Sequence, residues 1–153
     1  MATSRVEFGF DQDRSFNRRD LGLGIAPDPS RVLVVGLSQI NRIVVSKIVE
    51  RSGLRPVTET PITAIRVLPL LFPGLVILDG GAANADCDAL LPGILALRRI
   101  SGRDVPAVIL LSTRNGSPES LALSSTVDAV VAKPFNTDQL QPIVERLLER
   151  VRR

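Results

Sequence analysis

Four runs of consecutive apolar residues recur at intervals along the chain. None of them alternates between apolar and polar positions, which is the pattern of strands whose two faces are both covered. A fifth run is more polar and predicts an edge strand. In chain order, the five predicted strands are RVLVVG (31–36), RPVTET (55–60), GLVILD (74–79), AVILL (107–111) and DAVVAK (128–133), of which 55–60 is the polar one.

Each predicted strand is followed by a segment of helical length that begins at a capping residue. Ser38 is predicted to be a plain N-cap of the first helix, which ends near Arg51 and is stopped by Gly53. The alternative is that this helix start, with Arg42 on its second turn, binds an anion or a small polar ligand. The last segment carries one apolar stripe at helical spacing, from Leu140 to Val151. The predicted helices cover 38–51, 61–72, 88–100, 117–125 and 136–152.

Strands that alternate with helices form a parallel sheet with helices on both of its faces. Right-handed crossovers leave few topologies, and five strands most simply take the order 2-1-3-4-5. The sequence therefore predicts an α/β, flavodoxin-like domain with five strands and five helices. Ligands of such sheets bind outside the carboxyl ends of the strands, at the switch point between strands 1 and 3. Asp79 closes the third strand, so we expect it at that crevice.

Residues 1–30 do not fit the strand–helix repeat, and we assign them to an N-terminal arm or linker that precedes a domain at 31–153. The arm is rich in Asp, Arg and Asn, yet Phe8, Phe10 and Phe16 are three of the five aromatic residues of the chain. We expect the arm to pack on its own domain, on a second protomer or on a partner. The alternative is a solvated extension.

The composition narrows the function. The chain has no His, the commonest general base and metal ligand, which argues against hydrolytic and zinc enzymes. The net charge of +3 comes from basic residues that are scattered apart from one cluster, ERLLERVRR, at the C-terminus. That cluster is interpreted as complementing the dipole of the last helix, with nucleic-acid binding as the alternative. There is no Tyr or Trp for base stacking, so nucleic-acid binding is not expected. Cys87 is the only cysteine, and the chain shows neither a secretory signal nor an apolar run of about 20 residues for a membrane span. We expect a cytoplasmic protein without a disulfide or membrane contact.

The residues that end the strands form a recognisable set if the topology holds, because the carboxyl ends of parallel strands share one edge of the sheet. A carboxylate, a hydroxyl and a lysine each end a separate buried strand. The set consists of Gly36 and Leu37 after strand 1, Asp79 after strand 3, Ser112 and Thr113 after strand 4, and Lys133 and Pro134 after strand 5.

With this set the chain resembles the receiver domain of bacterial two-component response regulators over about residues 31–152. The marks are LVILDGG around Asp79, VILLST at Ser112 and, most specifically, VVAKPFNTDQL at Lys133. The resemblance implies that Asp79 matches the phospho-accepting aspartate, and that Ser112, with Thr113 beside it, matches the hydroxyl that senses the phosphoryl group. It also implies that Lys133 pairs with that group and that the Lys133–Pro134 peptide bond is cis.

The chain departs from the receiver pattern directly after strand 1. Receivers carry two acidic residues there that hold Mg²⁺, and this chain has Gly36 and Leu37 instead. Since Mg²⁺ is usually held by one or two carboxylates plus phosphate oxygens, Asp79 is left nearly alone. Asp86 in the following loop is a doubtful substitute, and a role in capping the next helix is favoured. No cofactor is therefore expected, and a Mg²⁺ site is doubtful.

We interpret the chain as a single-domain, atypical receiver, or pseudo-receiver, that acts by protein–protein contact rather than by Mg²⁺-dependent phosphorylation, with an Asp79–Lys133 ion pair in the site. It is not expected to be an enzyme. The expected partners are signalling proteins such as a histidine kinase, or a second copy bound through 117–152 or the arm. One alternative is a conventional receiver phosphorylated on Asp79 by a histidine kinase. Another is a small flavodoxin-like ligand or cofactor binder.

Overall fold

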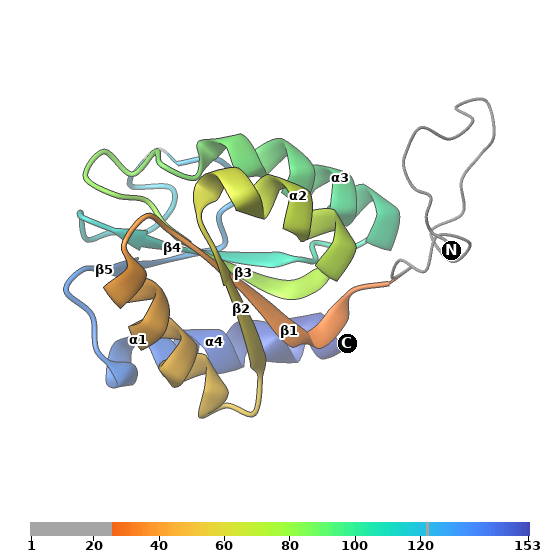
Figure 1. The fold of residues 1–153 in the computed structure, drawn as a ribbon, viewed down its shortest axis with the longest axis horizontal. Coiled ribbons are helices and arrows are strands. Elements are labelled where there is room, and N and C mark those ends of the chain that lie inside the picture. Colours follow the sequence, from red (N-terminus) through yellow and green to blue (C-terminus); the bar gives the residue numbers. More distant parts are fainter. Residues whose placement is uncertain (1–25, 122) are drawn as a thin grey trace.

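The computed structural model describes residues 26–121 and 123–153, which contain a five-stranded sheet in the order β2-β1-β3-β4-β5 (Figure 1). Every neighbouring pair of strands is parallel. The predicted sheet order and the edge position of the more polar second strand are thus confirmed. The strands are β1 (Asp28–Val35), β2 (Arg55–Glu59), β3 (Pro73–Asp79), β4 (Ala107–Ser112) and β5 (Ala129–Ala132).

Helices cover both faces of the sheet, with α1 and α4 on one side and α2 and α3 on the other (Figure 1). Successive strand residues point to opposite faces, so the strands feed two separate cores. Val32 and Val34 pack in the core beneath α1 and α4, while Leu33 and Val35 pack in the core beneath α2 and α3. The helices are α1 (Gln39–Glu50), α2 (Pro61–Leu71), the 3₁₀ turn η1 (Asp88–Leu90), α3 (Leu91–Ser101) and α4 (Thr137–Arg152).

The predicted helix starts are largely confirmed by side-chain caps. The Ser38 hydroxyl accepts a hydrogen bond from the Asn41 amide, as a plain N-cap does. Thr60 and Asn136 each take part in a capping box at the start of α2 and α4. The third predicted helix differs in its first turn, because η1 precedes α3 and Pro92, which lacks an amide hydrogen, stands near its start. None of the described helices is long and apolar enough to traverse a bilayer.

The helix predicted at 117–125 is wrong, so the described residues contain four α-helices instead of five. The described part of this segment forms turns and irregular backbone. Ser117 and Ser120 exchange hydrogen bonds between their amides and hydroxyls, which starts one helical turn. Serine side chains also compete with the backbone for hydrogen bonds, and a helix this short is marginal unless packing supports it. The turn therefore does not propagate.

The first strand begins three residues earlier than predicted, at Asp28, so 28–30 belong to β1 and not to the arm. The Asp28 amide donates to the Phe72 carbonyl (2.8 Å), and the Asp28 carboxylate pairs with Arg55 on β2 (3.0 Å). These polar contacts extend the strand past its apolar run. The rest of the predicted arm, with its three Phe residues, lies outside the described residues.

A partly buried ionic cluster anchors the connection between β4 and β5. Arg98 on α3 contacts the Asp128 carboxylate at 2.8 Å and also donates to the Thr126 carbonyl at 3.0 Å. The Val108 amide and the Arg150 guanidinium bind the same Asp128 oxygen. These contacts hold the C-terminal end of the β4–β5 connection, which contains no regular helix in its described part, against α3 and β4.

Candidate functional site

The predicted pairing of Asp79 with Lys133 is confirmed. Asp79 closes β3 and Lys133 follows β5, and the Lys133 Nζ lies 2.6 Å from Asp79 Oδ1. The Lys133 side chain is 20% exposed and that of Asp79 is 8% exposed, so the pair is largely withdrawn from water. The Lys133–Pro134 bond is cis, as the resemblance implied. Strand order thus brings together two charges that are 54 residues apart in the chain.

Asn41 completes the site, and the sequence analysis missed it. Its side-chain Nδ2 donates to Asp79 Oδ2 at 2.8 Å, and the Gly81 amide donates to Oδ1 at 3.4 Å. Asn41 sits in the first turn of α1, where Ser38 caps the helix beside the carboxyl end of β1. The sequence feature that could have revealed Asn41 is a polar residue in the first turn of the helix that follows the first strand. Both oxygens of the Asp79 carboxylate are therefore bound by groups of the protein itself.

These contacts determine the charge of Asp79. Burial by itself raises the pKa of the carboxyl, but hydrogen bonds from Asn41 and Lys133, together with the Lys133 charge, bring that pKa below its usual value. Asp79 is consequently ionised at neutral pH. Its pair with Lys133 is a charged one.

The lowered pKa of Asp79 predicts an acid-dependent stability. A carboxyl whose pKa is lower in the folded state contributes stability above its unfolded pKa of about 3.9, and this contribution is lost as pH falls through the folded pKa. We therefore expect the free energy of unfolding to fall below about pH 4. Urea titrations at several pH values between 7 and 3 measure it, and Asp79→Asn should show a shallower fall. The pKa of Asp28 is also lowered, chiefly by Ser30, so part of the dependence remains in the variant. Equal slopes would contradict the assignment to Asp79.

Of the two positions of the missing acidic pair, the first is closed to a simple replacement and the second is exposed. A Cβ atom added at Gly36 would lie 2.7 Å from the Cβ of Asp79, so glycine permits the close approach of β1 and β3. Leu37 is 65% exposed, and the Gly36 carbonyl accepts a hydrogen bond from the Arg42 guanidinium. The backbone here is thus tied to α1.

The residues around Asp79 do not fit a Mg²⁺ ion. Asp86 is exposed, and its carboxylate lies against Gly81 on the loop after β3. Nowhere in the described ranges do three His, Cys, Asp or Glu side chains gather closely enough to hold a metal. Mg²⁺ requires several oxygen ligands, and the oxygens of Asp79 already accept from nitrogen donors.

The Ser112 hydroxyl, which matches the phosphate-sensing hydroxyl of receivers, accepts hydrogen bonds from groups other than Asp79 and Lys133. Ser112 is fully buried, and its Oγ accepts hydrogen bonds from Asn84 Nδ2 and the Arg114 amide, both at 2.9 Å. Asn84 Oδ1 also accepts from the amide of the exposed Thr113 at 3.1 Å. Sequence analysis missed Asn84 as well. Its signal was an Asn after two glycines and two alanines, and it adopts the left-handed conformation that Asn tolerates (φ 59°).

Cys87 connects the loop after β3 to the same strand end. Its Sγ donates to the Asp79 carbonyl at 3.3 Å, and the side chain is buried. Burial, together with the negative charges of Asp79, Asp86 and Asp88, raises the pKa of this thiol to about 12. The thiol is therefore neutral at physiological pH and is not an activated nucleophile.

Comparison with solved structures gives a consistent set of neighbours. A receiver domain of a histidine kinase from Syntrophus aciditrophicus is 29% identical over 81% of this chain and 93% of its own, with a TM-score of 0.64. The receiver domain of a protein assigned as a LuxO repressor from Vibrio parahaemolyticus is 25% identical over 80% and 92%, with a TM-score of 0.65. The pseudo-receiver domain of the CikA protein matches in fold, at 19% identity over 81% and 98% and a TM-score of 0.56.

No protein-family model and no curated protein matches the sequence. The structural neighbours, the 2-1-3-4-5 sheet order and the Asp79–Lys133 pair nevertheless all point to the receiver-domain fold. The described part of the chain has the fold of response-regulator receiver domains, and the solved structures similar to it are receiver domains.

Proposed function

We propose that the protein is a pseudo-receiver of a two-component signalling pathway, which acts through protein–protein contact without Mg²⁺-dependent phosphorylation of Asp79. One observation carries this proposal: the Asp79 carboxylate is bound on Oδ1 by Lys133 and on Oδ2 by Asn41. Phosphoryl transfer depends on positioning and on a metal that neutralises the developing charge. Asp79 has an internal partner on each oxygen, and within the described residues no group of three His, Cys, Asp or Glu side chains surrounds it to hold a metal.

Exposed apolar side chains beside the site support a role in protein contact. Leu37 and three residues of α1 are large, apolar and exposed, and α1 is also the helix that carries Asn41. The spacing of the three residues places them on one face of α1, and an apolar helix face that is open to solvent suits contact with another protein. The three residues are Ile40, Ile43 and Val44.

The partners we propose are signalling proteins. One solved neighbour is the receiver domain of a histidine kinase, and another, from NtrC4, is a receiver domain dimer. A histidine kinase and a second copy of the chain bound through 117–152 or the N-terminal arm remain the proposed partners. We further propose that the protein is not an enzyme and that it works in the cytoplasm.

An attempt to phosphorylate the protein tests the proposal. The full chain is incubated with Mg²⁺ and acetyl phosphate, and its intact mass is read for a phosphoryl adduct. We expect no adduct on the wild-type protein or on Asp79→Asn, while an ordinary receiver labels in parallel. Circular dichroism establishes that each sample is folded. An adduct on the wild-type protein that Asp79→Asn abolishes would overturn the proposal.

That outcome would favour the second candidate function, a conventional receiver phosphorylated on Asp79. The observation in its favour is the Lys133 ammonium, which lies against the Asp79 oxygen where a phosphoryl group would need a cation. A phosphorylated protein would have to break the Asn41 or Lys133 contact to free an oxygen.

A further inference from the structure

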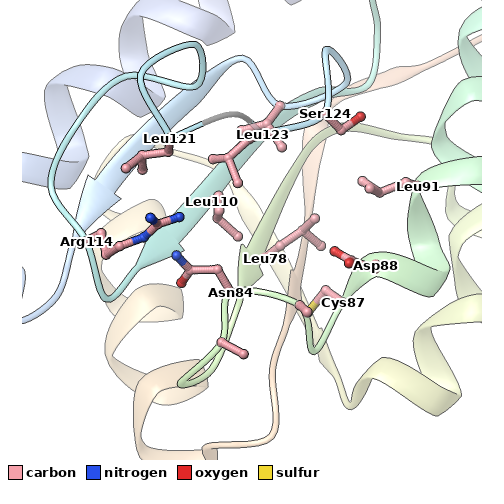
Figure 2. A pocket seen from close by; sticks show the side chains of 13 residues that line it. Leu78, Asn84, Cys87, Asp88, Leu91, Leu110, Arg114, Leu121, Leu123 and Ser124 are labelled. Atoms are coloured by element: carbon pink, nitrogen blue, oxygen red, sulfur yellow. The ribbon is translucent and has the colours of Figure 1, made fainter.

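A cavity of about 300 Å³ lies between the loop after β3 and the connection from β4 to β5 (Figure 2). Leu78 and Leu110, both buried on the sheet, form one side of it, and Leu121 and Leu123 lie on the other side. It is separate from the Asp79 carboxylate, which faces α1 and Lys133.

The cavity occurs where the expected helix is missing. The described residues between β4 and β5 form turns, so Leu121 and Leu123 are only half-buried. The end of this connection cannot close down on the sheet freely, because Arg98 binds both Thr126 and Asp128. An apolar space is therefore left between the sheet and the β4–β5 connection, whose C-terminal end is held in place by Arg98.

The charges at the rim are placed on opposite sides of the cavity. Arg114 lies at one side and Asp88 at the other, with the leucine side chains between them (Figure 2). In the part of the chain that the structure describes, the Arg114 guanidinium makes no ion pair or hydrogen bond. A negatively charged group is attracted to the Arg114 side and repelled from the Asp88 side. The cavity thus has an apolar middle and one free cationic edge.

The volume sets the size of a ligand. Liquid water occupies about 30 Å³ per molecule, so the space holds on the order of ten water-sized groups. It lies at the lower end of the range of about 300–1,000 Å³ that is usual for small-molecule sites. A compact organic acid with about ten non-hydrogen atoms fits the volume, the leucine walls and the Arg114 edge together.

The cavity touches two residues that hold the strand ends of the site. Asn84 lines it, and the same side chain donates to Ser112 Oγ and accepts from the Thr113 amide. Cys87 also lines it and donates to the Asp79 carbonyl. A ligand in the cavity therefore contacts the groups that fix the conformation of Ser112 and the backbone at Asp79.

We propose that this cavity binds a small apolar carboxylic acid, with the carboxylate at Arg114, and that binding is transmitted through Asn84 to Ser112 and Thr113. The binding step stands independently of the function proposed above. The further inference that ligand binding takes the place of phosphorylation as the signal rests on the proposed function.

Titration of the full, isotopically labelled chain with phenylacetate, followed by NMR, tests the proposal. Phenylacetate has ten non-hydrogen atoms, and phenylacetamide is its uncharged match of the same shape. We expect saturable shifts at Leu110, Leu121 and Leu123, with affinity for phenylacetate at least about fivefold higher than for phenylacetamide. The Asn84 side-chain amide and the Thr113 amide should shift with the same dissociation constant.

Arg114→Gln should reduce the affinity for phenylacetate to that for phenylacetamide and leave the affinity for phenylacetamide unchanged. Arg114 is exposed, so the variant is expected to fold. Arg99→Gln is the matched control, since Arg99 is exposed on α3 and does not line this cavity. No saturable binding, equal affinity for acid and amide, or an unchanged affinity in Arg114→Gln would overturn the site. Binding without a response at Asn84 and Thr113 would overturn its coupling. A phosphoryl adduct on Asp79 would overturn only the proposed function.

Discussion

Gly36→Asp, which restores an acid at the first degenerate position, is expected to destabilise the protein by about 3 kcal/mol or more without creating a phosphorylation site. The new Cβ would lie 2.7 Å from the Cβ of Asp79, a distance that real structures do not tolerate without movement of β1 or β3. The added carboxylate would also face the ionised Asp79, and like charges at such a distance repel strongly. Urea denaturation at pH 7 measures the loss.

Two further variants separate steric crowding from charge. Gly36→Ala adds the Cβ alone and is expected to cost about 1–3 kcal/mol. Leu37→Asp adds a carboxylate at the second degenerate position, where the side chain is 65% exposed, and should change stability by no more than about 0.5 kcal/mol. If Gly36→Asp were as stable as the wild type and labelled with acetyl phosphate and Mg²⁺, the proposed closure of the site would be wrong.

Lys133→Met should lower the free energy of unfolding by about 2–3 kcal/mol at pH 7. The substitution keeps much of the side-chain volume but leaves the Asp79 carboxylate with only Asn41 and Gly81 as donors. Removing one partner of a fully buried ion pair costs about 3–5 kcal/mol, and the partial exposure of Lys133 reduces this figure. Urea titrations of both proteins give the difference.

The pH dependence of that difference identifies its cause. In the variant, the lysine no longer lowers the pKa of Asp79, while burial still raises it. The Asp79 carboxyl of the variant therefore takes up a proton at a higher pH than that of the wild type. Protonation removes the unpaired charge, so the difference in stability should narrow as pH falls from 7 toward 4. Lys47→Met, at an exposed lysine of α1, is the control and should change stability by less than about 0.5 kcal/mol at either pH. A difference that stays constant with pH would assign the effect to lost packing.

The strands and their order could be predicted because their signal is local and strong. Consecutive apolar residues in β3 and β4 require cover on both faces, and the alternation of strands with helices indicates a parallel sheet whose crossover helices provide it. That topology places Asp79 and Lys133 at one edge of the sheet, so their pairing followed from strand ends alone.

The helix predicted at 117–125 shows where local signals are not enough. A start signal at Ser117 and Pro118 promotes the first turn, but the persistence of a short helix depends on the apolar surface it buries. Leu121 and Leu123 stay half-buried beside a cavity, so packing does not supply that stabilisation.

The sequence by itself determined the α/β class, the sheet order, most helix caps and the positions of Asp79, Ser112 and Lys133. Beyond the Asp79–Lys133 pair, tertiary structure alone decided which groups those side chains bind. Asn41 reaches Asp79 across 38 residues, and Asn84 reaches Ser112 across 28. Such contacts depend on how α1 and the loop after β3 pack against the sheet, and neither periodicity nor spacing encodes that geometry. This packing accounts for the Asp79 carboxylate with both oxygens bound, for the hydrogen-bonded Ser112 hydroxyl and for the cavity beside them.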